Sequence, residues 1–402
     1  METTRFDVAV VGLGAMGSMA AWRLASRGAK VIGFDRYEPP HSMGSSHGQS
    51  RIIRSAYYEG PGYVPLVREA FELWRLLERE SGDSILTMTG ALMIGPPDSE
   101  LVSGSLVSAR EWGLEHEVLQ PADVHRRFPR YRLRDDEMAV YDVAAGFVRP
   151  EKAVGAALDR ARALGAEIHT DVAVDRVEPG VVQIGRKTLR VSHVIVCTGA
   201  WNSTGVLPQL DMPLEVTRQC MVWFRPRTPA LHTPEAAPVF VHGTTGDAIH
   251  AYGFPSVDGE TVKIGVSGDH GPEHPDAIDR VVYPADVEPA VRYAATALPD
   301  LDPEPVRSVI CLQENSPDRH FVIGTLERGL SVLAGFSGHG FKFAPVIGDV
   351  AADLALDGGT SRPIEQFAPN RFASPHPALR ARRDQDAFLA PNLRPQRGRE
   401  KR

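Results

Sequence analysis

The chain has 402 residues, of which 43% are hydrophobic and 24% are charged, and its formal net charge is −7. These values are typical of a globular protein of about two domains, and the negative charge argues against binding to nucleic acid. We also expect no membrane association, because no segment approaches the roughly 18 consecutive apolar residues of a membrane span.

The N-terminal region has the pattern of a dinucleotide-binding unit. Residues 6–11 predict a buried strand, residues 18–28 a helix that ends at a glycine, and residues 30–35 a second strand. The motif G-L-G-A-M-G at 12–17 separates the first strand from the helix, and its glycines permit a tight turn and close approach of a pyrophosphate. Asp35 ends the second strand, where it can accept hydrogen bonds from ribose hydroxyls. The motif alone does not distinguish FAD from NAD.

A segment rich in glycine and serine follows at residues 39–54. His47, Arg51 and Arg54 have the i, i+4, i+7 spacing of one helical face, so a helix here would point three potential cations in one direction. Such a group suits a reduced flavin, which carries negative charge near N1, or a substrate carboxylate. A solvated basic face is the alternative, but the nearby glycines favour close approach to a ligand.

Two strand–glycine units recur in the second half of the chain. The apolar strand that ends at Cys197 leads into Thr198-Gly199-Ala, and Cys197 itself is expected to be core. Residues 330–334 predict a strand, followed by the loop G-F-S-G-H-G-F-K-F and a helix from Pro345 to Leu356. Lys342 at the exit of this loop would add a positive charge. The second unit therefore also points to an anionic ligand.

These motifs resemble the monomeric sarcosine oxidase and N-methyltryptophan oxidase family, within the D-amino-acid-oxidase-like flavoproteins. The matching segments occur in family order from residue 6 to about residue 370: G-L-G-A-M-G, P-P-H-S-M-G-S-S-H-G-Q-S-R-I-I-R, E-G-P-G-Y-V-P-L, T-G-A-W-N, Y-G-F-P-S, S-P-D-R-H-F-V-I-G and G-F-S-G-H-G-F-K-F. The resemblance implies a two-domain α/β fold, in which a Rossmann-type FAD-binding domain adjoins a β-rich substrate domain. We expect the FAD domain at 1–85, 146–215 and 310–372, the substrate domain at 86–145 and 216–309, and a disordered basic tail at 373–402.

The resemblance further implies that FAD is attached covalently, by a thioether between Cys311 and the flavin 8α-methyl group. Cys311 has the family's position before S-P-D-R-H-F, whereas sequence physics alone would make it a small buried hydrophobic residue. A thiolate must make this attack, so nearby cations are expected. The other expected cofactor-binding residues are Gly12, Gly14, Ala15, Met16, Gly17, Asp35, Arg36, Ser45, His47, Arg51, Thr198, Gly199, Gly338, His339, Gly340 and Lys342.

By the same resemblance, Arg54 and Lys342 grip a substrate carboxylate, and Tyr252 lines the substrate cavity. Lys263 matches the lysine that activates oxygen, and the expected catalytic residues are Lys263, Arg51, His47 and Tyr252. Two positions of the substrate cavity depart from the sarcosine oxidases, because Ser267 and Gln313 replace a histidine and a tyrosine. We therefore expect the chemistry to be kept and the substrate to differ from sarcosine.

The implied reaction oxidises the C–N bond of a small N-methyl amino acid or cyclic imino or amino acid to an imine and reduces O2 to hydrogen peroxide. Alternatives are a biosynthetic tailoring oxidase for a larger amino-acid-derived substrate, a flavin dehydrogenase with another electron acceptor, and a non-catalytic flavin-binding protein. Lys263 favours an oxidase. The three cysteines lack metal-ligand spacing, and the N-terminal run is not a secretory signal, so we expect a cytoplasmic protein without a metal. We also expect a monomer.

Overall fold

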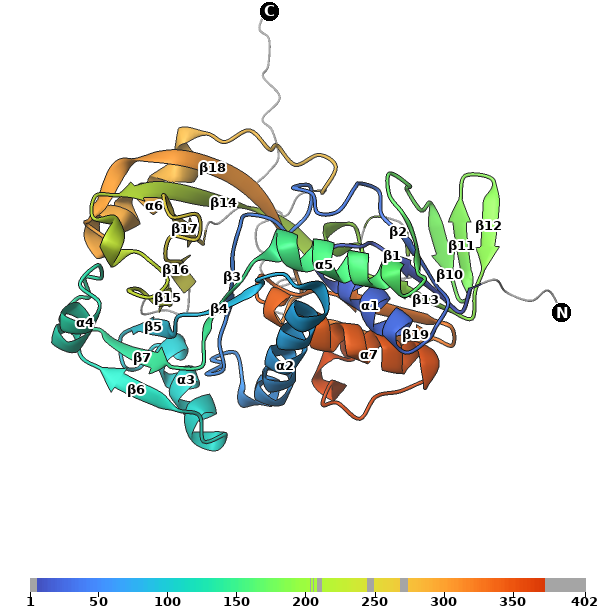
Figure 1. The fold of residues 1–402 in the computed structure, drawn as a ribbon, viewed down its shortest axis with the longest axis horizontal. Coiled ribbons are helices and arrows are strands. Elements are labelled where there is room, and N and C mark those ends of the chain that lie inside the picture. Colours follow the sequence, from blue (N-terminus) through green and yellow to red (C-terminus); the bar gives the residue numbers. More distant parts are fainter. Residues whose placement is uncertain are drawn as a thin grey trace, which may run out of the picture.

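The computed structural model describes residues 6–202, 204, 206–207, 212–243, 249–267 and 274–372. Figure 1 shows a helix-covered sheet at the right and a second, larger sheet at the left, joined by segments that cross between them. No helix of the described part of the chain combines the length and the apolar character that crossing a membrane requires.

A six-stranded sheet forms the right half, with the strand order β19-β20-β13-β1-β2-β9. Its strands pair in parallel except β19, which is antiparallel to β20. The strands are β1 (Val8–Val11), β2 (Val31–Phe34), β9 (Glu167–His169), β13 (His193–Val196), β19 (Val322–Glu327) and β20 (Leu330–Ala334). Short strands rich in valine and isoleucine suit this position, because a parallel sheet is buried on both faces.

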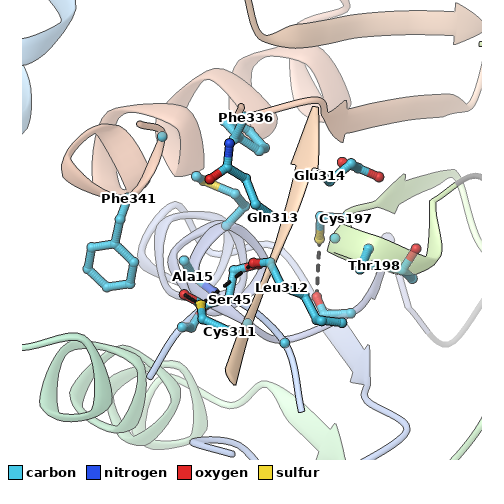
Figure 2. A pocket seen from close by; sticks show the side chains of 18 of the residues that line it. Ala15, Ser45, Cys197, Thr198, Cys311, Leu312, Gln313, Glu314, Phe336 and Phe341 are labelled. Atoms are coloured by element: carbon cyan, nitrogen blue, oxygen red, sulfur yellow. Dashed lines mark hydrogen bonds between the residues drawn. The ribbon is translucent and has the colours of Figure 1, made fainter. Parts of the chain in front are cut away.

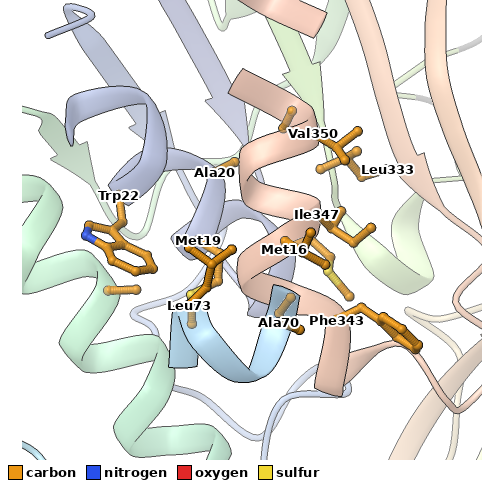
Figure 3. Close-up of a cluster of buried hydrophobic side chains, with 14 of the residues drawn as sticks. Met16, Met19, Ala20, Trp22, Ala70, Leu73, Leu333, Phe343, Ile347 and Val350 are labelled. Atoms are coloured by element: carbon orange, nitrogen blue, oxygen red, sulfur yellow. The ribbon is translucent and has the colours of Figure 1, made fainter. Parts of the chain in front are cut away.

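Helices cover this sheet and form the main hydrophobic core. They are α1 (Ala15–Ser26), α2 (Val64–Ser81), α5 (Pro150–Ala163) and α7 (Ala344–Leu356). Helix α1 packs against both α5 and α7, and Figure 3 shows Met16 of α1 beside Ile347 of α7. A Cβ at Gly348 would lie 2.7 Å from the Met19 carbonyl, so a glycine lets the two helices approach.

An eight-stranded sheet forms the left half, with the order β18-β14-β17-β16-β15-β5-β7-β6. Its strands are β5 (Ala91–Gly95), β6 (His116–Leu119), β7 (Met138–Asp142), β14 (Glu215–Pro226), β15 (Val239–Gly243), β16 (Ile249–Gly253), β17 (Val262–Val266) and β18 (Leu301–Asn315). Three helices contact this sheet: α3 (Glu100–Glu111), α4 (Pro121–Arg127) and α6 (Pro284–Ala297). The long antiparallel pair β14–β18 extends from this sheet toward the first one.

Two three-stranded sheets complete the fold. One contains β3 (Arg51–Ile53), β4 (Leu86–Met88) and β8 (Gly146–Val148), and the other contains β10 (Arg176–Glu178), β11 (Val181–Ile184) and β12 (Lys187–Arg190). In Figure 1 the second of these sheets lies at the outer edge of the right half.

The structure confirms the predicted α/β fold class and the strands and helices around both glycine motifs. The helical face predicted from His47, Arg51 and Arg54 is wrong. Residues 47–50 form a turn in which Gly48 and Gln49 have φ values of 95° and 70°, and β3 then pairs with β8. Successive β-branched isoleucines favour the strand over a helix.

The predicted domain division stays a prediction, and β18 crosses its boundary at 309/310. The predicted disordered tail at 373–402 lies outside the described residues.

Candidate active site

A cavity of about 670 Å³ runs along the edge of the six-stranded sheet and onto the face of the β14–β18 pair. Most of the residues predicted from sequence line it, although they come from distant parts of the chain. These are Gly12, Gly14, Ala15, Met16, Asp35, Arg36, Ser45, Arg51, Arg54, Thr198, Gly199, Tyr252, Ser267, Cys311, Gln313, Gly338, His339, Gly340 and Lys342. Figure 2 shows how Cys311, Ser45, Gln313 and Phe336 face the same space.

One end of the cavity is built from the N-terminal glycine motif. The Ser46 hydroxyl accepts a hydrogen bond from the Ala15 amide at 3.1 Å at the start of α1, which points its N-terminus toward the cavity. Asp35 accepts hydrogen bonds from the amides of Leu13 at 2.7 Å and Tyr37 at 2.9 Å. A Cβ at Gly12 would lie 2.5 Å from the Cys197 carbonyl oxygen, so this turn requires glycine. A helix N-terminus beside an acidic strand end fits the phosphates and ribose of a dinucleotide.

Cys311 lies in the middle of the cavity wall, on β18. Its side chain is buried, and its Sγ is 3.7 Å from Nη2 of Arg51. The same Nη2 donates to the Ser45 carbonyl at 2.7 Å, which fixes the guanidinium beside the thiol. The pair register sets Gln219 of β14 opposite Cys311. The thiol thus opens onto the cavity with a cation next to it, as a nucleophilic thiolate requires.

Two buried cations lie at the far end of the cavity. Arg54 is 3% exposed and donates from Nη2 to both carboxylate oxygens of Glu59, at 2.8 and 2.6 Å. Lys342 is 4% exposed and donates from Nζ to the His339 carbonyl at 2.6 Å. Burial, followed by the charge of Arg54, lowers the pKa of Lys342 to about 7, although Glu59 acts in the opposite direction. Burial would raise the pKa of Glu59, but Arg54, His339 and Lys342 together outweigh burial and keep that pKa below its usual range.

Three predicted residues do not line the cavity. Gly17 packs so closely on the Gly12 carbonyl that a side chain would overlap it, which is the packing role expected of the third glycine. Lys263 lies behind the wall, where Nζ donates to the carbonyls of Gly48 at 2.7 Å and Ser50 at 2.6 Å. Burial and then Arg51 hold the pKa of Lys263 well below its usual range.

His47, the third of these residues, is also buried behind the wall. Its Nε2 has no hydrogen-bond partner among the described residues. Burial and then the charge of Arg51 lower its pKa to about 4, so the imidazole is neutral at pH 7. The tight turn at Gly48 and Gln49 explains why sequence spacing misplaced His47.

Besides Arg54 and Lys342, three other residues are predicted to contact substrate, and their surroundings differ. Tyr252 of β16 lies over Gly265 of β17, where an added Cβ would overlap its ring. Gln313 donates from Nε2 to Asn315 at 2.6 Å and lies against Gly338 of the second glycine loop. Ser267 is exposed just beyond the end of β17. The cavity is therefore polar on this side.

Sequence reasoning missed three acidic residues around the cavity. Glu59 pairs with Arg54, and an acid five residues after a buried cation was a signal available in the sequence. Glu314 is buried and accepts from the amide of Gly335 at 2.7 Å, and burial raises its pKa to about 7. Glu151 binds the 48–49 amides from a helix about a hundred residues later, so no local pattern pointed to it.

Comparison with known proteins identifies the family to which the chain belongs. The family model described as FAD dependent oxidoreductase matches residues 7–354. The chain is 41% identical to a monomeric sarcosine oxidase of Streptomyces avermitilis over 379 residues, which cover 92% of this chain and 98% of the relative. It is 32% identical to an N-methyl-L-tryptophan oxidase of Salmonella typhi, with 92% and 100% covered. Among solved structures, the chain superposes on NikD with a TM-score of 0.80 at 27% identity, and the match covers 91% of this chain and 98% of that one. NikD is an amino acid oxidase essential for nikkomycin biosynthesis.

Proposed function

The chain belongs to the FAD dependent oxidoreductase family, with monomeric sarcosine oxidase and N-methyl-L-tryptophan oxidase as relatives, and from this premise we propose that it is an amine oxidase. Its substrate would be a small N-methyl amino acid or a cyclic imino or amino acid, oxidised at the C–N bond with O2 as electron acceptor. The relatives named monomeric support a monomer. The observation that carries the proposal is the pair of buried cations, Arg54 and Lys342, in the same cavity as the glycine motif.

FAD would occupy the cavity along the residues that line it. The N-terminus of α1 and Asp35 would hold the phosphates and ribose, and Cys311 would bind the flavin 8α-methyl group through a thioether. The bound flavin would supply the two-electron oxidation of the substrate and the reduction of oxygen. The Arg51 guanidinium, fixed 3.7 Å from Sγ, places a positive charge beside the thiol that would form this attachment.

Arg54 and Lys342 would anchor the substrate by its carboxylate. Because Glu59 already occupies the Arg54 guanidinium with both oxygens, an incoming carboxylate must displace Glu59 or share the arginine with it. Two buried cations beside one internal carboxylate leave net positive charge, which favours a second carboxylate. Anchoring at this point would fix the amine and its neighbouring carbon relative to the cavity wall.

Lys263 would serve the oxygen-dependent step. Its ammonium is held by two carbonyls one layer behind the wall and lies 4.2 Å from the Phe254 ring, which itself lines the cavity. A fixed positive charge at that place would stabilise negative charge as it develops on oxygen. The substrate selectivity would come from Ser267 and Gln313, so sarcosine is not the expected optimum.

The test is a peroxide assay of the purified protein against N-methyl, cyclic and D-amino acids under air. We expect peroxide with at least one carboxylated secondary amine and none with the matching amine that lacks a carboxylate. Turnover only with an artificial electron acceptor, and no peroxide with any amine, would contradict the oxidase and favour a dehydrogenase.

The covalent attachment is tested on the same preparation. Acid precipitation of the wild-type protein should leave the yellow flavin with the polypeptide, because a thioether survives denaturation. Cys311→Ser should release its FAD under the same treatment, and Cys220→Ser, which replaces a buried cysteine outside the cavity lining, is the control. Loss of all flavin from the wild type on denaturation would rule out the linkage.

A further inference from the structure

The turn at residues 47–51 carries two groups of the proposed active site but is held in place from outside the cavity. His47 begins the turn and Arg51 ends it. Gly48 and Gln49 are consecutive residues with positive φ, a conformation that points their two amide N–H groups the same way. Gln49 pays a conformational penalty in this region, so the surroundings must stabilise the turn.

Glu151 supplies that stabilisation from the first turn of helix α5. Its Oε1 accepts hydrogen bonds from the Gly48 amide at 2.6 Å and the Gln49 amide at 3.1 Å. Its Oε2 lies 3.2 Å from the same Gln49 amide. An acid in the first turn of a helix is common because it favours the helix dipole, but that role needs no contact with another loop. The short bonds to the turn therefore call for a second explanation.

The opposite side of the turn is where Lys263 binds. The carbonyls of Gly48 and Ser50 accept from its Nζ at 2.7 and 2.6 Å, so the turn lies between a carboxylate and an ammonium group. Trp223, the neighbour of Lys263 across the β14–β17 pair, donates from Nε1 to the Gln49 side chain at 2.7 Å. A change in the turn would therefore move the two carbonyls that locate the ammonium.

We propose that Glu151 is a positioning residue of the active site, whose carboxylate holds the 47–51 turn so that its carbonyls locate the Lys263 ammonium. Glu151 does not line the cavity, so it acts through the turn and not on substrate or cofactor. The inference rests on the proposed role of Lys263 in the oxygen-dependent step.

The charges around Lys263 support this assignment. Burial and then Arg51 lower the pKa of Lys263, and Glu151 raises it, with Cys311 also raising it and Arg307 lowering it. For His47, burial and then Arg51 lower the pKa, Glu151 raises it, and Lys263 and Arg280 lower it further. The Glu151 carboxylate thus offsets a group of cations at both side chains. Its removal should make Lys263 lose its proton at a lower pH.

The test compares Glu151→Gln with Glu80→Gln. Glu80 also contacts α5, by accepting from Arg160 at 3.3 Å, but it touches neither the turn nor the cavity. In hydrogen–deuterium exchange, Glu151→Gln should raise amide exchange in peptides covering 46–52 by about ten- to a hundredfold, the value of a charge-assisted hydrogen bond. Glu80→Gln should leave those peptides unchanged. Unchanged exchange at 46–52 in Glu151→Gln would overturn the proposal.

A second readout separates positioning from general stability. In stopped-flow experiments, the rate of reoxidation by oxygen in Glu151→Gln should fall off at lower pH than in the wild type, while anaerobic reduction keeps its pH profile. Glu151→Asp keeps the charge and should restore the wild-type profile, and it also serves if Glu151→Gln does not fold. If the pH profile of reoxidation shifts as far in Glu151→Asp as in Glu151→Gln, the charge of Glu151 does not set the pKa of Lys263, and that part of the proposal is overturned.

The Lys263→Met variant distinguishes the two levels of the argument. If Lys263→Met reoxidises as fast as the wild type, the proposed role of Lys263 fails, whereas exchange at 46–52 still tests the Glu151 contact by itself. If Lys263→Met is slow but Glu151→Gln has a normal reoxidation profile, the role of Lys263 stands and the positioning role of Glu151 is overturned.

Discussion

The two ends of the cavity are built in different ways. At the glycine end, one short segment supplies the turn, the helix N-terminus and, at Asp35, the acid, and its polar contacts are mainly backbone amides. At the cationic end, Arg54 follows β3 and Lys342 follows β20, and each charge already has a partner, Glu59 or the His339 carbonyl. The first end depends on backbone conformation, and the second on charges that the fold brings together. Mutations at the glycine end should therefore prevent folding or flavin binding, whereas mutations at the cationic end should change the kinetics of a folded enzyme.

The largest effect is expected at Gly17. Gly17→Ala would drive a methyl group into the Gly12 carbonyl oxygen, and because that atom is backbone, the turn itself must distort. We expect loss of bound FAD or of soluble protein, measured by flavin absorbance per polypeptide. Gly155→Ala is the matched control, because a Cβ on this glycine of α5 meets nothing within 4 Å. It should keep its flavin and gain up to about 1 kcal/mol of stability. A normal flavin content in Gly17→Ala would contradict the close packing.

The next largest effect is expected at Lys263, and it should be confined to oxygen. Lys263→Met keeps the bulk of the side chain but removes the positive charge. Anaerobic flavin reduction should stay within about tenfold of the wild type, whereas reoxidation should slow by about a hundredfold or more, since about 2.7 kcal/mol of transition-state stabilisation is a hundredfold in rate. Stopped-flow spectroscopy measures both steps. A collapse of reduction together with fast reoxidation would assign Lys263 to the substrate instead.

The difference between the two ends also decided what could be predicted from the sequence. The motif at 12–17 and the strand and helix after it are local, so spacing alone placed them correctly. Spacing predicts a helix at His47 and Arg51 because it cannot reveal that Gly48 and Gln49 take positive φ, a conformation supported by the distant Glu151. Lys263 was recognised only by resemblance, and its position behind the wall follows from pairing between β14 and β17.

A smaller effect is expected when the cationic end loses one charge. Arg54→Ala and Lys342→Ala should each raise KM for a carboxylated substrate by about ten- to a hundredfold, since a charge-assisted hydrogen bond contributes roughly 1.5–3 kcal/mol. Steady-state peroxide assays provide KM and kcat. Arg227→Ala is the control, because this exposed arginine pairs with Asp302 outside the cavity lining. Unchanged KM in both active-site variants would rule out a carboxylate clamp.

The smallest effect concerns the pH dependence of the same clamp. The pKa of Lys342 lies at about 7 in the free protein, because burial and Arg54 lower it more than Glu59 raises it. A bound carboxylate favours the charged ammonium, so binding above pH 7 must include uptake of a proton. Affinity should be nearly constant below pH 7 and should weaken as the pH rises, by at most about tenfold per pH unit.

The measurement is the Kd of a non-reacting carboxylate between pH 6 and pH 9. Binding is monitored through the change that the carboxylate causes in the flavin spectrum. Lys342→Met should bind more weakly at pH 6 and should lose most of the pH dependence, so its Kd should approach that of the wild type at pH 9. Although burial would raise the pKa of Glu59, nearby cations, Arg54 first, hold it below its usual range, so this carboxylate stays ionised throughout and does not contribute to the slope. A slope that persists in Lys342→Met would show that another group titrates, and the cationic end would then bind its ligand through Arg54 alone.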